Sequence, residues 1–188
     1  MRLLRYRESG LVIPVTMSLR GFIRMQVRRP DGRCRHDSGW FPNLVLDQGL
    51  EFLGEISTPH GVCQVGSGTA TPTASDTGLA SFVAGTSNKE ETTKSAAGSA
   101  PFHASIDRRW RFGAGDAAGN LSEVGFGSAA TGSMLFSRAL ITDSNGDPTT
   151  ITVLSDEILD VTYELQSIPP TTDSTFSVTD SGPAGTSH

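Results

Sequence analysis

The chain has 188 residues, enough for one domain with extended ends, and only 36% of them are hydrophobic. Its 21 glycines and 10 prolines favour short strands joined by turns over a helical bundle. No apolar run approaches the roughly 20 residues of a membrane-spanning helix. No signal peptide is expected either, because the run at 11–15 is short and Pro14 interrupts it. The composition therefore predicts a soluble protein with one thin β-rich core.

Charge is distributed unevenly along the chain. The net charge is -5, but residues 1–40 carry nine arginines against three carboxylates, so this segment is net +6 and the remainder net -11. A basic segment of this kind binds nucleic acid or the acidic surface of another protein. Nucleic-acid binders interleave aromatic residues that stack on bases, and few aromatics lie among these arginines. Docking on other copies or other proteins is therefore favoured over nucleic acid, with these candidate interaction residues: Arg2, Arg5, Arg7, Arg24, Arg28 and Arg29.

The chain begins with an extended arm and a hairpin. Residues 1–18 show no turn pattern that would tie them to a core, which is typical of an arm that orders on a neighbour. From 23 to 28, apolar and polar residues alternate, and Arg-Pro-Asp-Gly at 29–32 is a strong turn signal. The strand pattern resumes over 33–41. We therefore expect a β-hairpin with an arginine-rich face.

One short helix is predicted over about 43–54. Asn43 suits the N-cap, leucines recur with helical spacing at 46, 50 and 53, and Gly54 stands where a C-terminal glycine cap would lie. Gly49 inside the helix costs about 1 kcal/mol relative to alanine. The helix therefore depends on packing against the sheet.

Further strands follow the helix. They are predicted over 62–65, around 79–84 within a Ser/Thr-rich excursion, over 102–112, where Arg108 interrupts an apolar face, and over 121–126.

The segment 134–165 gives the clearest strand pattern. An apolar run at 134–141 and another at 151–154 flank a turn at 143–148, and period-two alternation over 159–165 is typical of a half-buried strand. We interpret this segment as a core hairpin. The whole pattern predicts a mainly β protein, an antiparallel β-sandwich or a partly closed barrel with one short helix. The predicted boundaries are an extended arm at 1–18, a β-rich core domain at 19–167 and a low-complexity C-terminal tail at 168–188.

Candidate metal and catalytic residues have simpler explanations. The spacing of Asp143, Asn145 and Asp147 matches a calcium loop, but Leu154 stands where the bidentate glutamate belongs, and an Asn-Gly turn accounts for the same residues. The acidic residues at 156, 157 and 160 suit a solvated turn better than a hydrolytic carboxylate pair.

The remaining chemistry-bearing residues show no functional pattern. The four histidines share no ligand spacing, and a Cys34–His36 dyad is disfavoured because it would be exposed beside arginines. Cys34 and Cys63 form no disulfide framework or zinc site, and whether they pair is left open. Of the aromatics that could hold a sugar, Tyr6, Trp40, Trp110 and Tyr163, three fit a strand-face core better. The sequence therefore assigns no catalytic, cofactor-binding or metal-binding residue, and predicts no enzyme.

Four segments of the chain, taken together and in order, resemble segments of a known protein family. They are RRPDGRCRHDSGWFPNLVLDQGLEFLG (28–54), CQVGSGTATPTASDTGL (63–79), GNLSEVGFGS (119–128) and 134–165, and they cover about half of the chain. Together they resemble tailed-bacteriophage virion proteins described as tail, tail-fibre or fibre-attachment proteins.

The resemblance implies a non-enzymatic β-rich subunit of the virion, assembled in the host cytoplasm and placed on the phage tail, at a baseplate, tail tip or fibre-attachment site. Its implied partners are copies of itself and other tail proteins, with host-surface contact as a further option and no cofactor. It brings no catalytic residues. The alternatives are a neck, collar or head-surface decoration protein and, from a different class, a host-glycan-binding or glycan-hydrolysing module.

Overall fold

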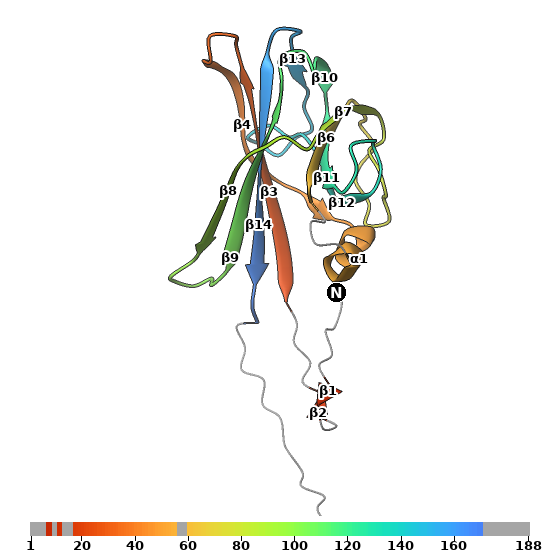
Figure 1. Ribbon diagram of the computed structural model, residues 1–188, viewed down its shortest axis with the longest axis vertical. Helices are drawn as coiled ribbons and strands as arrows, with labels where there is room; N and C mark the ends of the chain where they lie inside the picture. The colour runs from red at the N-terminus through yellow and green to blue at the C-terminus, as the bar shows by residue number, and fades with distance from the viewer. Residues whose placement is uncertain (1–6, 9–10, 13–16, 56–59, 171–188) are drawn as a thin grey trace, which may run out of the picture.

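Two five-stranded antiparallel sheets face each other in the computed structural model, which describes residues 7–8, 11–12, 17–55 and 60–170 (Figure 1). The large sheet has the order β4-β3-β14-β9-β8, with these bounds: β3 Ser18–Arg28, β4 Cys34–Pro42, β8 Lys89–Ala96, β9 Ala104–Phe112 and β14 Ile158–Ile168. The small sheet has the order β5-β12-β11-β6-β7, with these bounds: β5 Leu44–Val45, β6 Val62–Gly66, β7 Phe82–Thr86, β11 Glu123–Gly127 and β12 Leu135–Leu140.

Two two-stranded sheets and one helix complete the described part of the chain. β10 (Gly119–Leu121) pairs with β13 (Ile151–Val153), β1 (Arg7–Glu8) pairs with β2 (Leu11–Val12), and α1 spans Asp47–Glu55. The predicted mainly β fold with one helix is confirmed. Two architectures were predicted, a β-sandwich and a partly closed barrel. The sandwich is confirmed, because the two sheets do not close into a barrel. Most of the predicted arm and tail lies outside the described residues.

The core fills the space between the two sheets. Alternate residues of β3 and β14 point inward, as their period-two pattern predicts, and meet the inward residues of β6, β11 and β12. Three aromatic rings lie at the centre: Phe126 stacks on Tyr163 with ring centroids 4.3 Å apart, and Trp110 lies 5.0 Å from Phe126. Such contacts stabilise a core beyond the area that they bury.

The segment 134–165 is divided between the sheets and does not form a hairpin. β12 pairs with β11 and β5, β13 pairs with β10, and β14 lies between β3 and β9. The turn itself is confirmed, since the Gly146 amide donates to the Asp143 carbonyl and Gly146 has φ +87°. The hairpin prediction is wrong because a local turn pattern does not determine which distant strand completes each ladder.

The helix begins four residues later than predicted. Leu44 and Val45 extend along β12 as a short strand, and α1 starts at Asp47. Asn43, the predicted N-cap, instead lies between β4 and β5 and is bonded to the large sheet: its amide donates to the Gly21 carbonyl, and its side chain lies 3.1 Å from the Tyr163 hydroxyl. On the helix itself, the predicted core residue Leu53 is 45% exposed.

Gly49 lies where α1 passes close to β12. A Cβ at this position would lie 2.7 Å from the carbonyl carbon of Phe136 and 2.8 Å from its Cα. Real Cβ atoms do not approach backbone so closely, and a glycine here permits the packing on which the helix depends.

We therefore expect Gly49→Ala to lower the free energy of unfolding by about 1–3 kcal/mol, although alanine favours a helix by about 1 kcal/mol. Urea denaturation compares this variant with Glu51→Ala, an exposed position of the same helix that should change stability by less than about 0.5 kcal/mol. A stabilised Gly49→Ala protein would contradict the close approach.

Candidate interaction surface

The large sheet runs past the small sheet toward the bottom of Figure 1, where β8, β9, β14 and β3 lie side by side. Its inner face covers the core, and its outer face is turned away from the small sheet. The side chains on the outer face come from the polar positions of each alternating strand. No described strand pairs with the outer side of β4 or β8, so this face and these two edges are where a partner could bind.

A row of charged side chains crosses the outer face from β8 to β3. Asp160 on β14 accepts from Arg111 Nε and from Arg28 Nε, each at 2.7 Å, and Arg111 also pairs with Glu90 on β8 at 3.2 Å. We call Glu90, Arg111, Asp160 and Arg28 the charged row. It connects four neighbouring strands through one carboxylate at its centre.

Asp160 is ionised at neutral pH and serves as a buried structural anion. Its side chain is only 1% exposed. Burial by itself raises the pKa of a carboxyl, but the hydrogen bonds from Arg111 and Arg28 outweigh it and lower the pKa of Asp160. An acid with a lowered pKa held by two arginines is poorly suited to donate a proton in hydrolysis.

Glu157 makes a second buried ion pair, between the turn before β14 and strand β4. Arg35 Nη2 donates to Glu157 Oε2 at 2.8 Å, and the Leu154 amide donates to the same oxygen at 2.9 Å. The hydrogen bond from Arg35 lowers the pKa of Glu157. The interpretation of the acidic cluster as a solvated turn is therefore wrong for Glu157 and Asp160, which are buried, and fits only Asp156, which is exposed.

The candidate arginines differ in how much of their charge is free. Arg28 belongs to the charged row, and Arg24 is held by Asp37 at 2.9 Å on the same face. Arg29 is exposed in the turn between β3 and β4. Arg7 lies in β1 and its side chain is not described, while Arg2 and Arg5 lie outside the described residues. The sequence reasoning missed Arg35 and Arg111, although the alternation of Arg111 with Trp110 and Phe112 places it on the outer face.

A separate buried network lies on the side of the small sheet away from the core. Glu123 on β11 is fully buried and accepts from the amides of Gly68, Ala80 and Ser81 at 3.0, 3.0 and 2.7 Å. Arg138 on β12 donates to Glu123 at 2.9 Å and to the Ala70 carbonyl, also at 2.9 Å. These bonds hold the loop 67–81 against the sheet, although the sequence suggested only a surface excursion there.

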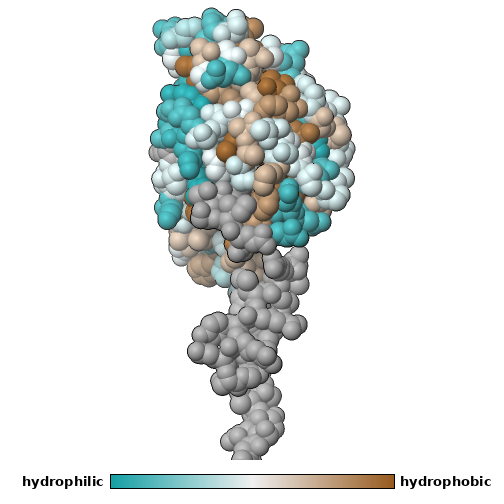
Figure 2. Space-filling view, turned by 45° about the vertical axis from the view of Figure 1, so that its right-hand side comes forward, coloured by the Kyte–Doolittle hydropathy of each residue, from teal (hydrophilic) through white to brown (hydrophobic). Residues whose placement is uncertain are grey.

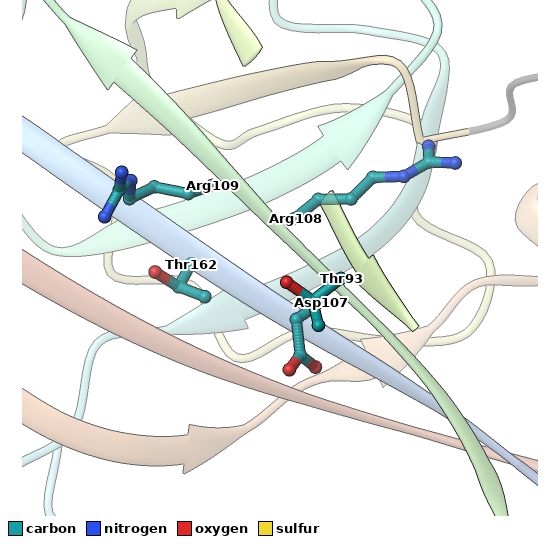
Figure 3. A pocket seen from close by; sticks show the side chains of 5 residues that line it. All are labelled: Thr93, Asp107, Arg108, Arg109 and Thr162. Carbon is teal, nitrogen blue, oxygen red and sulfur yellow. The ribbon is translucent and has the colours of Figure 1, made fainter. Parts of the chain in front are cut away.

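Two shallow hollows lie on the large sheet. The first is a pocket of about 160 Å³ on β8, β9 and β14, where Asp107 and Arg109 share one face while Arg108 points away from Arg109 (Figure 3). Burial raises the pKa of Asp107, and the facing Glu164 raises it further. Sites for drug-sized ligands usually exceed about 300 Å³. This pocket is therefore too small to enclose one.

The second hollow is an apolar groove of about 410 Å³ at the end of the large sheet. It is lined by residues of β8, β9, the loop between them and the two ends of the described core: Met17, Ala96, Ala97, Phe102, His103, Ala104, Ser167 and Pro169.

Apolar side chains are also exposed elsewhere. Figure 2 shows, on the side nearer the small sheet, a narrow band of apolar residues among polar ones. On the outer face of the large sheet, Trp40 is 49% exposed opposite Arg24. The expectation that Trp40 belongs to the core is wrong, because it alternates with Phe41, which takes the inward position. Trp110 and Tyr163 are buried as expected, and Tyr6 lies outside the described residues.

The two cysteines are free thiols. Cys34 is exposed on β4, and Cys63 is buried on β6 in the other sheet, where burial raises its pKa. Within the described ranges, no three His, Cys, Asp or Glu side chains are grouped so that they could hold a metal ion. The same ranges contain no helix long and apolar enough to cross a membrane.

His60 is the one described histidine that is buried. Its ring lies 5.5 Å from that of Phe136 and 6.3 Å from that of Tyr163, and neither ring nitrogen has a hydrogen-bond partner among the described residues. Burial, with the nearby charges of Arg108 and Lys89, lowers the pKa of His60 to about 4.

Acid should therefore destabilise the fold through His60. The unfolded chain takes up this proton near pH 6.5 and the folded chain only near pH 4, so the free energy of unfolding should fall by about 3 kcal/mol between pH 7 and pH 4. Urea denaturation across this range should show a smaller fall in His60→Leu, which cannot take up the proton. Equal falls in the two proteins would exclude His60 as the cause.

Comparison of the chain with protein-family models, with curated proteins and with solved structures finds no match.

Proposed function

We propose that this chain is a tail-associated structural subunit of a bacteriophage virion, which acts by assembly and has no catalytic activity. The observation that carries the proposal is the large sheet, which extends past the small one and whose edge strands β4 and β8 have no further strand beside them in the part of the chain that the structure describes. Open edges pair with strands of another chain through backbone hydrogen bonds. The resemblance of the four ordered segments supplies the phage tail as the place of assembly.

The bonding of the carboxylates supports a structural role. Glycoside hydrolysis needs two carboxyl groups on either side of a bound sugar, one of them able to donate a proton. Glu157 and Asp160 are instead held by arginines, with lowered pKa values, and they join strands to one another. Such networks make a subunit rigid, which reduces the entropic cost of assembly.

The arginine-rich segment contributes less free charge than its sequence suggests. Arg24, Arg28 and Arg35 pair with carboxylates of the same chain. Arg29 and Arg33 stay exposed in the turn between β3 and β4, where Arg33 makes a long, solvent-exposed ion pair with Asp31 at 3.8 Å. Docking on an acidic neighbour would therefore use this turn and the arm, and it should weaken as salt rises.

Purified particles test the proposal. Mass spectrometry should detect the chain in several copies per particle, and antibody labelling in electron microscopy should mark the tail. Labelling at the neck or head would contradict the tail position and favour the alternative decoration role. Absence from purified particles would overturn the structural role.

Carbohydrate binding is a second candidate, favoured by Trp40. An exposed indole beside the Arg24–Asp37 pair offers a sugar an apolar face to stack on and polar groups to hydrogen-bond. A glycan array probed with the purified chain should show binding that Trp40→Ala removes and that Leu154→Ala, an exposed apolar control, retains. An array without binding would exclude this candidate.

A further inference from the structure

The four sheet edges are not equally suited to pairing with another chain. β4 is irregular, with register shifts against β3 at two places, and β5 has two residues. Beside β7 lies the loop before β12: a Cβ on Gly85 would be 2.9 Å from the Ala130 Cα. β8 is eight residues long and pairs with β9 on one side, with a single register shift at its start, between Lys89 and Glu91, and it has no strand on its other side among the described residues.

β8 is accessible and held in place. Its described side chains are all exposed, and in Figure 1 it forms the outer edge of the part of the large sheet that extends past the small sheet. Near the start of β8, Glu90 of the charged row pairs with Arg111 of β9. Near its end, the Ser95 hydroxyl hydrogen-bonds to the Ser105 hydroxyl of β9 at 2.6 Å. Such an edge is ordered before a partner arrives, so pairing costs little conformational entropy.

The sequence of β8 is complementary to itself when reversed. Lys89-Glu90-Glu91-Thr92-Thr93-Lys94-Ser95-Ala96 places one lysine and both carboxylates in the first half, which is net -1, and a lone lysine in the second, which is net +1. Antiparallel pairing of two copies sets the Lys94 half of each strand beside the Glu90 half of the other, whereas parallel pairing would set like charges together. The central threonines are β-branched and suit a cross-strand pair.

We propose that β8 strands of two copies pair antiparallel about Thr92 and Thr93, so that two large sheets form one continuous sheet across a two-fold axis. This inference rests on the proposed function, because it names the strand and the partner through which such a subunit assembles. The contact is isologous: the same strand supplies both sides of the interface.

Analytical ultracentrifugation of the full chain over a range of concentrations tests the pairing. The wild-type chain should form dimers, and Thr92→Lys combined with Thr93→Lys should raise the dissociation constant at least about tenfold, because like charges then lie opposite each other. The control adds the same two charges elsewhere, by Ser144→Lys and Thr149→Lys in an exposed loop, and should leave the dimer unchanged. Circular dichroism checks that both variants fold.

Cross-linking gives a second measurement. In a Cys34→Ser background, which leaves only the buried Cys63, Thr92→Cys combined with Thr93→Cys should form a disulfide-linked dimer under mild oxidation, because position 92 of one copy faces position 93 of the other; either substitution alone, or Thr149→Cys, should not.

A wild-type chain that stays monomeric would overturn the pairing. So would an oligomer that survives the double lysine substitution without cross-linking at β8, although the subunit role would then stand. Conversely, absence of the chain from particles would overturn that role and leave β8 pairing intact.

Discussion

Replacing Glu123 by alanine is expected to lower the free energy of unfolding by about 3–5 kcal/mol, the cost of leaving one partner of a buried ion pair without the other. Arg138 would stay buried and keep one ion pair, that with Asp76, a carboxylate that is 23% exposed. The amides of Gly68, Ala80 and Ser81 would lose their acceptor at the same time. Unsatisfied buried donors carry a further cost, which offsets the support that Arg138 keeps from Asp76.

Urea denaturation measures the loss, and hydrogen exchange locates it. Amides of the loop 67–81 should exchange faster in Glu123→Ala, while those of β3 and β14 should keep their protection relative to global unfolding. Asp156→Ala removes an exposed carboxylate and should change stability by less than about 0.5 kcal/mol. A loss below about 1 kcal/mol with unchanged loop exchange would show that Glu123 does not hold the loop.

The sequence predicts strand faces well because alternation is local. Ile23, Met25 and Val27 fill the core as their spacing indicates, and so do Leu159, Val161 and Tyr163. Strand pairing is not local. β14 pairs with β3, which lies more than a hundred residues earlier in the chain, and no turn pattern in the sequence indicates this pairing. The predicted hairpin at 134–165 failed for this reason.

The polar part of the fold was harder to predict for the same reason. Asp160 and Glu157 sit beside exposed Asp156, and a cluster of that composition is usually solvated. They are buried because distant strands supply their arginines: Arg28 and Arg111 for Asp160, and Arg35 for Glu157. The sequence shows that opposite charges occur in separate segments. It does not show which arginine pairs with which carboxylate.

Removing the central carboxylate of the charged row has the second large expected effect. Asp160→Ala should lower the free energy of unfolding by about 3–4 kcal/mol, near the lower end for a broken buried pair, because the two arginines that lose it remain about one-third exposed and can be hydrated. Asp37→Ala breaks an ion pair on the same face whose two members are both more exposed, and it should cost only about 1 kcal/mol or less.

The pH dependence of the free energy of unfolding distinguishes the effect of the Asp160 charge from the effect of its packing. The pKa of Asp160 is lower in the folded chain than in the unfolded chain, so its stabilisation is present above about pH 3.9 and is lost as the pH falls through the folded-state value. The shape-conserving variant Asp160→Asn should therefore differ from wild type in urea denaturation at pH 7, and this difference should shrink below pH 3.9. No difference at pH 7 would mean that Asp160 stabilises the sheet by shape alone, and the charged row would then have no electrostatic role. A difference that stayed constant with pH would show that ionisation of Asp160 is not its cause.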